Sequence, residues 1–186
     1  MRRLSRAEEE RAQDRSVPDL IARDLQLLLV GINPSLSSGA TGYHFATPGN
    51  RLWPALHGAG LTTRLLEPSD TRELLASGIG ITNLVNRATR SAKEVRHDEL
   101  LDGAVALRST VEAYRPRLVA VLGIGAFRRA FQQKGAQRGR QPIGLAPSQL
   151  WVLPNPSGIN AYYSTARLVE LFRAMREALE NPAHAG

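Results

Sequence analysis

The sequence predicts an α/β protein, a three-layer α/β/α sandwich whose central sheet is mainly parallel and has four or five strands. Short runs rich in Val, Ile and Leu occur without polar alternation, as in strands buried on both faces of a parallel sheet. Segments with helical periodicity separate these runs, and such alternation builds a sheet covered by helices on both sides. At 186 residues, with 42% apolar and 22% charged residues, the chain is expected to form one domain.

Four apolar runs are the expected strands: residues 25–32, 79–85, 117–124 and 150–154. The first and the last of them lead into loops that contain Pro, Gly and an Asn. The carboxyl ends of parallel strands meet at one edge of a sheet, and ligands bind in the crevice there. We therefore expect these two loops, from opposite ends of the sequence, to form one site.

Four segments are the expected helices: residues 51–60, 98–114, 125–133 and 165–179. In the second of them, Leu100 and Leu107 fall on one apolar face. In the first, Pro54 is compatible only with the first turn, and Gly60 is a typical stop. Residues 132–147, which contain three glycines and several basic residues, are expected to be an irregular basic excursion.

The expected domain organisation is simple. Residues 1–18 are a flexible or helical extension, and residues 19–182 are a single domain that acts as a monomer. The N-terminus is basic, but Glu8, Glu9 and Glu10 follow at once, without the apolar core of a secretory signal. No apolar stretch approaches the ~18 residues of a membrane span, so we expect no membrane partner and a cytoplasmic location.

The charge of the chain favours an anionic partner. Lys and Arg number 24 against 17 Asp and Glu, which gives a formal net charge of +7. Such an excess indicates nucleic acid or another anion, although a protein can also be basic without binding either. Cysteine is absent, so this chain has no thiol nucleophile and no Cys-ligated iron–sulfur cluster. The four histidines show no ligand spacing, and we expect neither a metal nor a cofactor.

The first loop, residues 31–50, is long for a structureless connection in a compact domain, and such loops are usually functional. Asn33 follows the strand directly, and its amide can hold a water but cannot accept a proton. Asn33 therefore fits hydrolysis by a water that its amide orients. The alternative is that Asn33 caps the turn after the strand. Phe45 is either a stacking platform for a base or a ring that covers the core below the loop.

The second loop runs from Asn155 to Ile159. Ile159 lies at the tip of a Pro-Gly turn, where an aliphatic side chain could enter a base stack as a wedge. Scattered exposed apolar residues are also ordinary on protein surfaces. The wedge interpretation depends on the polar loop and the basic charge that accompany this residue.

Four ordered motifs resemble one enzyme family over most of the chain. They are residues 29–38 (LVGINPSLSS), 41–45 (TGYHF), 50–53 (NRLW) and 151–158 (WVLPNPSG). In sequence and spacing they closely resemble the mismatch-specific uracil-DNA glycosylases, the Mug and thymine-DNA glycosylase branch of the uracil-DNA glycosylase superfamily. The resemblance also implies the fold of that superfamily.

The function implied by the resemblance is that of a monofunctional DNA glycosylase, a hydrolase that flips a base out of duplex DNA and initiates base excision repair. Its substrate would be uracil, thymine or a damaged pyrimidine opposite guanine, so its partner would be double-stranded DNA with G·U or G·T mismatches. It would act in the cytoplasm, associated with the nucleoid. Backbone N–H groups would stabilise the departing uracil anion, so that an amide-held water suffices.

Site residues carry over from the family motifs in three groups. Asn33 would position the water that attacks the sugar. The base pocket would be formed by Ile32, Ser38, Phe45 and Asn155. The wedge that fills the vacated stack and meets the opposite strand would be formed by Ser157, Gly158 and Ile159.

The chain departs from the family pattern at several positions. Ser35 stands in place of Gly, Ile159 in place of Leu, Asn83 where bacterial relatives often carry Lys, and Asn160-Ala161 where they often carry Ser-Arg. Two cationic contacts to DNA are therefore missing. The basic residues that could replace them are Arg87, Arg90, Lys93, Arg96, Arg138 and Arg140.

A function of a different class is a non-catalytic module that binds damaged or mismatched DNA. The same pocket would flip and hold a base without hydrolysis, because an amide provides no general base. Release of free uracil from a G·U oligonucleotide distinguishes the two functions.

Overall fold

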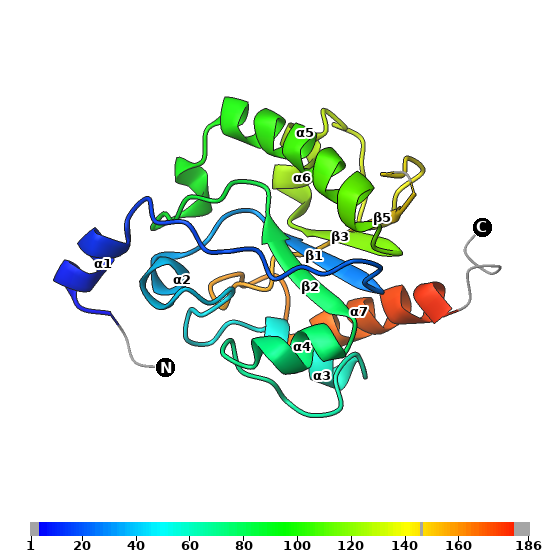
Figure 1. Cartoon of the computed structure of the whole chain (residues 1–186), viewed down its shortest axis with the longest axis horizontal. Coiled ribbons are helices and arrows are strands. Elements are labelled where there is room, and N and C mark those ends of the chain that lie inside the picture. The colour runs from blue at the N-terminus through cyan, green and yellow to red at the C-terminus, as the bar shows by residue number, and fades with distance from the viewer. Residues whose placement is uncertain (1–3, 146, 181–186) are drawn as a thin grey trace.

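The computed structural model describes residues 4–145 and 147–180 (Figure 1). Its centre is a five-stranded sheet in the order β2-β1-β3-β5-β4. The strands are β1 (Leu27–Gly31), β2 (Ile79–Asn83), β3 (Leu118–Leu122), β4 (Gly139–Arg140) and β5 (Gln149–Leu153). All neighbouring pairs are parallel except β4 with β5. The mainly parallel α/β fold predicted from the apolar runs is confirmed.

Helices cover both faces of the sheet. The helices α3 (Leu52–Gly58), α4 (Thr71–Ala76) and α7 (Thr165–Glu180) lie on one face, and α5 (His97–Tyr114) and α6 (Ile124–Ala130) lie on the other (Figure 1). Alternate side chains of β1 pack against the two helical layers. Leu29 belongs to the core cluster with α3 and α7, and Leu28 belongs to the cluster with α5 and α6. Both are fully buried, which explains the uninterrupted apolar run.

The register of the strands brings their carboxyl ends to one edge. Gly31, the last residue of β1, pairs with Asn83, the last residue of β2. On the other side of the sheet, Leu122 at the end of β3 pairs with Leu153 at the end of β5. The loops after β1 and β5 therefore leave the sheet at the same edge, as the parallel topology predicts.

The long first loop is not structureless. It contains the short helix α2 (Leu36–Thr41), which begins where the hydroxyl of Ser35 accepts a hydrogen bond from the Ser38 N–H, at 3.2 Å. Gly42 ends the helix with a positive φ of 76°. A local cap and the burial of Leu36 form this helix in a segment whose small polar residues favour loops.

The N-terminal segment is partly helical. The helix α1 (Arg6–Ala12) starts at a capping box between Ser5 and Glu8 and packs against α2. Val17 is buried, and its N–H donates to the side chain of Asn86 at 2.9 Å. The domain limits at residues 18, 19 and 182 stay predictions, and residues 1–3, 181 and 182 lie outside the described residues.

The basic excursion at residues 132–147 is largely irregular, with only the two-residue strand β4 in its described part. The short 3-10 helix η1 (Ala92–Glu94) follows β2 and leads into α5. Within residues 4–145 and 147–180, no helix is both long enough and apolar enough to cross a bilayer.

Candidate functional site

A cleft of about 540 Å³ opens at the carboxyl edge of the sheet, where both loops meet. Its walls come from the first loop, from residues 89–93 after β2, and from the second loop. Seven of the residues expected at the site line it: Ile32, Asn33, Ser38, Phe45, Asn155, Ser157 and Ile159. The eighth expected residue, Gly158, lies between Ser157 and Ile159 in the sequence. The structure thus brings together the two loops that the sequence placed at one site, whereas the individual roles of these residues stay predictions.

The carboxamide of Asn33 is held by its nitrogen. Its Nδ2 donates to the carbonyl oxygen of Arg87 at 2.9 Å and to Oγ1 of Thr89 at 2.7 Å, and it lies 3.0 Å from the carbonyl of Pro34. The Thr89 hydroxyl donates onward to the carbonyl of Ser91, at 2.9 Å, so it must accept from Asn33. Among the described residues, no hydrogen bond reaches Oδ1 of Asn33. That oxygen therefore remains available as an acceptor in the cleft.

The loop that holds Asn33 is itself anchored by an ion pair. The Arg87 guanidinium donates to both oxygens of Glu99, at 2.9 and 3.0 Å, and to Oδ1 of Asp14 at 2.9 Å. These bonds raise the pKa of Arg87. Arg87, together with the N–H of Arg96, lowers the pKa of Glu99 from its usual 4.5 to about 2. Arg87 is therefore a structural cation, and its backbone carbonyl is fixed where Asn33 needs it.

Phe45 covers the core, as one of its two interpretations predicts, whereas its role as a stacking platform stays a prediction. It packs against the core cluster of α3 and α7, and it also lines the cleft. Its φ of 50° lies in the left-handed region, and its carbonyl accepts a hydrogen bond from the Trp53 indole at 3.3 Å. The bond to a buried tryptophan offsets part of the cost of that backbone conformation.

Several residues that line the cleft were given no site role from the sequence, among them His44 and Asn83. His44 and Asn83 both line the cleft, and their side chains are 3.3 Å apart, between Nδ1 and Nδ2. Asn83 lies within the expected strand at residues 79–85 and was noted as a departure from the family pattern, but only the strand register places it beside Gly31. His44 belongs to the TGYHF motif, which gave it no role, because its neighbours in space come from distant parts of the chain.

Arg51 fixes the second loop. Its guanidinium donates to the carbonyl of Gly158 at 2.7 Å, to that of Asn160 at 2.9 Å and to that of Tyr163. Its backbone N–H donates to the carbonyl of Pro156 at 2.9 Å. The resemblance included Arg51 in the NRLW motif without giving it a role. These bonds hold the loop while Ile159 stays 94% exposed at its tip.

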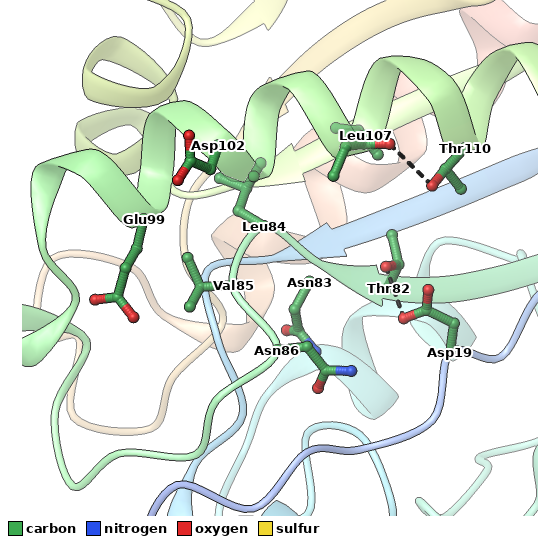
Figure 2. Close-up of a pocket in the computed structure, with 12 residues that line it drawn as sticks. Asp19, Thr82, Asn83, Leu84, Val85, Asn86, Glu99, Asp102, Leu107 and Thr110 are labelled. Carbon is green, nitrogen blue, oxygen red and sulfur yellow. Dashed lines mark hydrogen bonds between the residues drawn. The ribbon is translucent and has the colours of Figure 1, made fainter.

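A second cavity, of about 420 Å³, lies between the end of β2 and α5 (Figure 2). Its walls carry three carboxylates, those of Asp19, Glu99 and Asp102, whereas no Asp or Glu is among the described residues that line the cleft. Acidic side chains repel phosphate, so the cleft and not this cavity suits a nucleic acid. Asn83 is shared by the walls of both.

Three of the six basic residues expected to compensate for the missing cations are in ion pairs: Arg87 with Glu99, Arg96 with Asp98, and Arg90 with Glu9 at 3.4 Å. Arg90 is exposed in spite of its ion pair, and Lys93, Arg138 and Arg140 are exposed as well. Arg90 and Lys93 line the cleft, and the guanidinium of Arg138 stacks over Tyr163 beside the second loop, 5.4 Å from the ring centroid.

Comparison with known proteins identifies the family. A model of the uracil DNA glycosylase superfamily matches residues 18–180. The chain belongs to the uracil DNA glycosylase superfamily. A similar solved structure is the solution NMR structure of "a putative Uracil DNA glycosylase" from Methanosarcina acetivorans, with a TM-score of 0.60 and 21% identity over 88% of this chain and 98% of that one. At that identity, the likeness supports the fold alone.

Membership of the uracil DNA glycosylase superfamily gives the chain its reaction class and its macromolecular partner. The class is hydrolysis of the bond between a base and its sugar in DNA, and the partner is DNA. Asn33, Phe45 and Ile159 line one cleft.

Proposed function

We propose that the chain is a mismatch-directed uracil-DNA glycosylase of the Mug and thymine-DNA glycosylase branch. Its substrate is uracil, thymine or a damaged pyrimidine opposite guanine in duplex DNA. The observation that carries the proposal is the state of Asn33: its nitrogen is held by Arg87 and Thr89, and its oxygen is left to bind a water in a cleft that Phe45 also lines.

The reaction proceeds through a cationic sugar. The bond between C1′ and N1 of the base breaks, and the base leaves as an anion, which backbone N–H donors stabilise. The water held by Asn33 forms the new bond to C1′ and gives its proton to the solvent. Because no carboxylate is among the described residues lining the cleft, general-base help of roughly 10²–10⁴-fold is forgone. The reaction therefore depends on a good leaving group, such as uracil.

The preference for mismatches follows from the energetics of base flipping. Extrusion costs a few kcal/mol, and least where the base is mispaired. Stacking of the flipped base on Phe45 returns about 1–3 kcal/mol, and Ile159 fills the gap in the duplex. The residues proposed for the base pocket are Ile32, Ser38, Phe45 and Asn155, and those for the wedge are Ser157, Gly158 and Ile159.

We assign phosphate contacts to four exposed cations. Arg90 and Lys93 line one wall of the cleft, Arg138 lies over the ring of Tyr163, and Arg140 belongs to the same basic excursion as Arg138. In this proposal they serve in place of the cations absent at Asn83 and Ala161. The cytoplasmic, nucleoid-associated location and the monomeric state remain predictions.

The test is release of uracil from a G·U duplex under single-turnover conditions. Asn33→Ala should still bind the duplex but release uracil about 10²-fold more slowly or worse, because the water is no longer placed against the sugar. Gln133→Ala is the control, since Gln133 carries an exposed amide and does not line the cleft. Near-normal release by Asn33→Ala would contradict the mechanism.

A non-catalytic damage-binding module is the second candidate, favoured by the lack of a carboxylate among the described residues that line the cleft. It binds the same duplexes but liberates no free base. The same assay therefore separates the two functions, because a wild-type protein that binds G·U duplex and releases no uracil under any condition supports the module.

A further inference from the structure

The chain makes two successive turns after Pro156, at residues 158–159 and 161–162. Each turn carries a large apolar side chain that is almost fully exposed, Ile159 at 94% and Tyr162 at 93%. Single exposed apolar residues are ordinary on protein surfaces. Here, however, two of the five large ones among the described residues follow each other within one loop beside the cleft. The two side chains therefore have to be explained together.

The two turns are joined by Asn160, which lies between them. Its Nδ2 donates to the carbonyl oxygen of Asn155 at 3.0 Å, and its Oδ1 accepts from the backbone N–H of Tyr162 at 3.3 Å. Its own backbone N–H donates to the carbonyl oxygen of Ser157 at 3.0 Å, which closes the first turn. Asn160 thus fixes the second turn relative to the first.

Arg51 holds both turns to the body of the domain. Its guanidinium donates to the carbonyl oxygens of Gly158 and Asn160, at 2.7 and 2.9 Å, and to that of Tyr163. Gly158 belongs to the first turn, and Tyr163 directly follows the second. Because the donors of a guanidinium point in fixed directions, this one group holds the two turns in one arrangement.

Two adjacent tyrosines lie in different surroundings at the end of the second turn. The ring of Tyr163 packs against the core cluster of α3 and α7, and the guanidinium of Arg138 lies over it, 5.4 Å from the centroid. The ring of Tyr162 is left to the solvent. A stiff aromatic side chain on a fixed backbone loses little conformational entropy when a partner covers it, so most of the contact energy is gained on binding.

Tyr162 is not placed to hold a flipped base. Ile159 and Asn160 line the cleft, whereas Tyr162 does not line it. The part of a bound duplex that the second turn meets is therefore the part around the gap that the flipped base leaves. Flipping leaves one base there without a partner, and an aromatic ring stacks on any base because every base has a π-face.

We propose that Tyr162 packs its ring against the base opposite the flipped nucleotide, while Ile159 fills the gap itself. This inference rests on the proposed function, to which it adds a contact outside the base pocket and the wedge. Because Arg51 and Asn160 hold the two turns together, both side chains meet the duplex in one step.

The test compares binding of two duplexes that resist cleavage. Each carries 2′-fluoro-deoxyuridine, whose fluorine destabilises the cationic sugar, opposite guanine in one duplex and opposite an abasic-site analogue in the other. The cost of flipping differs between the duplexes but is the same for every variant. It therefore cancels when the dissociation constant of a variant is divided by that of the wild-type protein. A change on the first duplex alone reports contact with the opposite base.

Tyr162→Ala should weaken binding to the guanine duplex about tenfold, as expected for one lost stack of a base on an aromatic ring, and binding to the abasic duplex by less than about twofold. Tyr162→Phe keeps the ring and should stay within about twofold of the wild-type protein on both. Leu65→Ala is the control, because Leu65 is also an exposed apolar residue of a loop but does not line the cleft. Thermal unfolding shows that each variant is folded.

Equal losses on both duplexes in Tyr162→Ala would show a general contact or a disturbed loop, and they overturn the inference, as does no loss on either. A loss in Tyr162→Phe as large as that in Tyr162→Ala also overturns it, because the ring would then not be the group that acts. The probes are not cleaved, so failure of the proposed function is seen separately. A wild-type protein that shows these binding ratios but releases no uracil from a G·U duplex contradicts the proposed function and retains the contact of Tyr162.

Discussion

Gly31 shows how one missing side chain shapes the cleft. It ends β1 with an ordinary backbone conformation, so a turn is not the reason for a glycine here. The reason is the close approach of Asn83 and Phe45 to the position that a Cβ would occupy. Glycine often marks such close approaches within strands. The positions of Asn83 and Phe45 at the cleft therefore depend on the absence of a side chain on Gly31.

Replacing Gly31 by Ala tests this dependence. The added methyl group must displace the Asn83 amide, because 2.3 Å is far below van der Waals contact. We expect uracil release from G·U duplex to fall at least about tenfold, and stability to fall by about 1–3 kcal/mol, as for overpacking. Gly125→Ala, in helix α6 with nothing within 4 Å of the new atom, is the matched control and should leave both unchanged or raise stability.

The second loop is held to the segment that follows it because Arg51 joins their carbonyl groups. The carbonyls of Gly158, Asn160 and Tyr163 accept from one planar guanidinium, which has several donors in fixed directions. Gly158 also packs closely against the backbone of Gly49, 2.7 Å from a would-be Cβ. An exposed apolar tip on a fixed loop costs less conformational entropy on binding than a tip on a free loop.

Arg51→Met should therefore affect duplex substrates most. The loop loses its anchor, and we expect uracil release from duplex to fall about tenfold more than release from a single strand, which needs no wedge. Arg173→Met is the control, because Arg173 also donates to a carbonyl, that of Gly58 at 3.0 Å, but joins α7 to α3. Equal losses on both substrates would indicate that Arg51 supports the fold in general.

Ile159→Ala tests the wedge itself. The variant removes the aliphatic group without touching the bonds of the loop, so single-stranded uracil should be released at a near-normal rate. Release from the duplex should fall by about tenfold, since the vacated stack is no longer filled. Val105→Ala, an exposed β-branched residue on α5, serves as the comparison. If Ile159→Ala lost the same fraction of the wild-type rate on duplex and on single-stranded DNA, Ile159 would not be a wedge.

At the scale of the whole molecule, one ion-pair network connects the N-terminal segment, the segment after β2 and helix α5. Asp14, Arg87 and Glu99 come from these three regions, and Glu99 is the least exposed of the three. The network holds the carbonyl group to which Asn33 donates. The orientation of the Asn33 amide thus depends on residues outside the lining of the cleft.

The network makes a pH-dependent contribution to stability. The pKa of Glu99 is about 2 in the folded protein and near 4.5 in the unfolded chain, so the folded state binds fewer protons between these values. The stabilisation is present above about pH 4.5 and is lost as the pH falls toward about 2. Glu99→Gln should be less stable at pH 7, and its free energy of unfolding should vary less across this acid range.

Urea unfolding at a series of pH values measures this effect. Glu112→Gln is the control, because Glu112 is exposed on the same helix and the structure describes no ion pair for it. A Glu99→Gln variant with the same acid dependence as the wild-type protein would show that the ion pair with Arg87 contributes nothing to folding.

The sequence by itself determined the layers and the place of the site. Apolar runs such as residues 25–32 predict strands buried on both faces, and the carboxyl ends of parallel strands place Asn33 and Asn155 at one edge of the sheet. The helices at residues 98–114 and 165–179 were likewise predicted to within one residue at each end, because long amphipathic helices carry a strong periodic signal. These features follow from local patterns and from a general rule of topology.

Tertiary structure alone decided the partners within the site. The pairing of Gly31 with Asn83, the bond between His44 and Asn83, and the three carbonyls joined by Arg51 all link distant parts of the chain. Helix α2 was missed because its short, polar sequence has no helical period and depends on the Ser35 cap. Periodicity reports which face of an element is buried, but it does not report the strand register or the path of a loop, and these set which side chains meet.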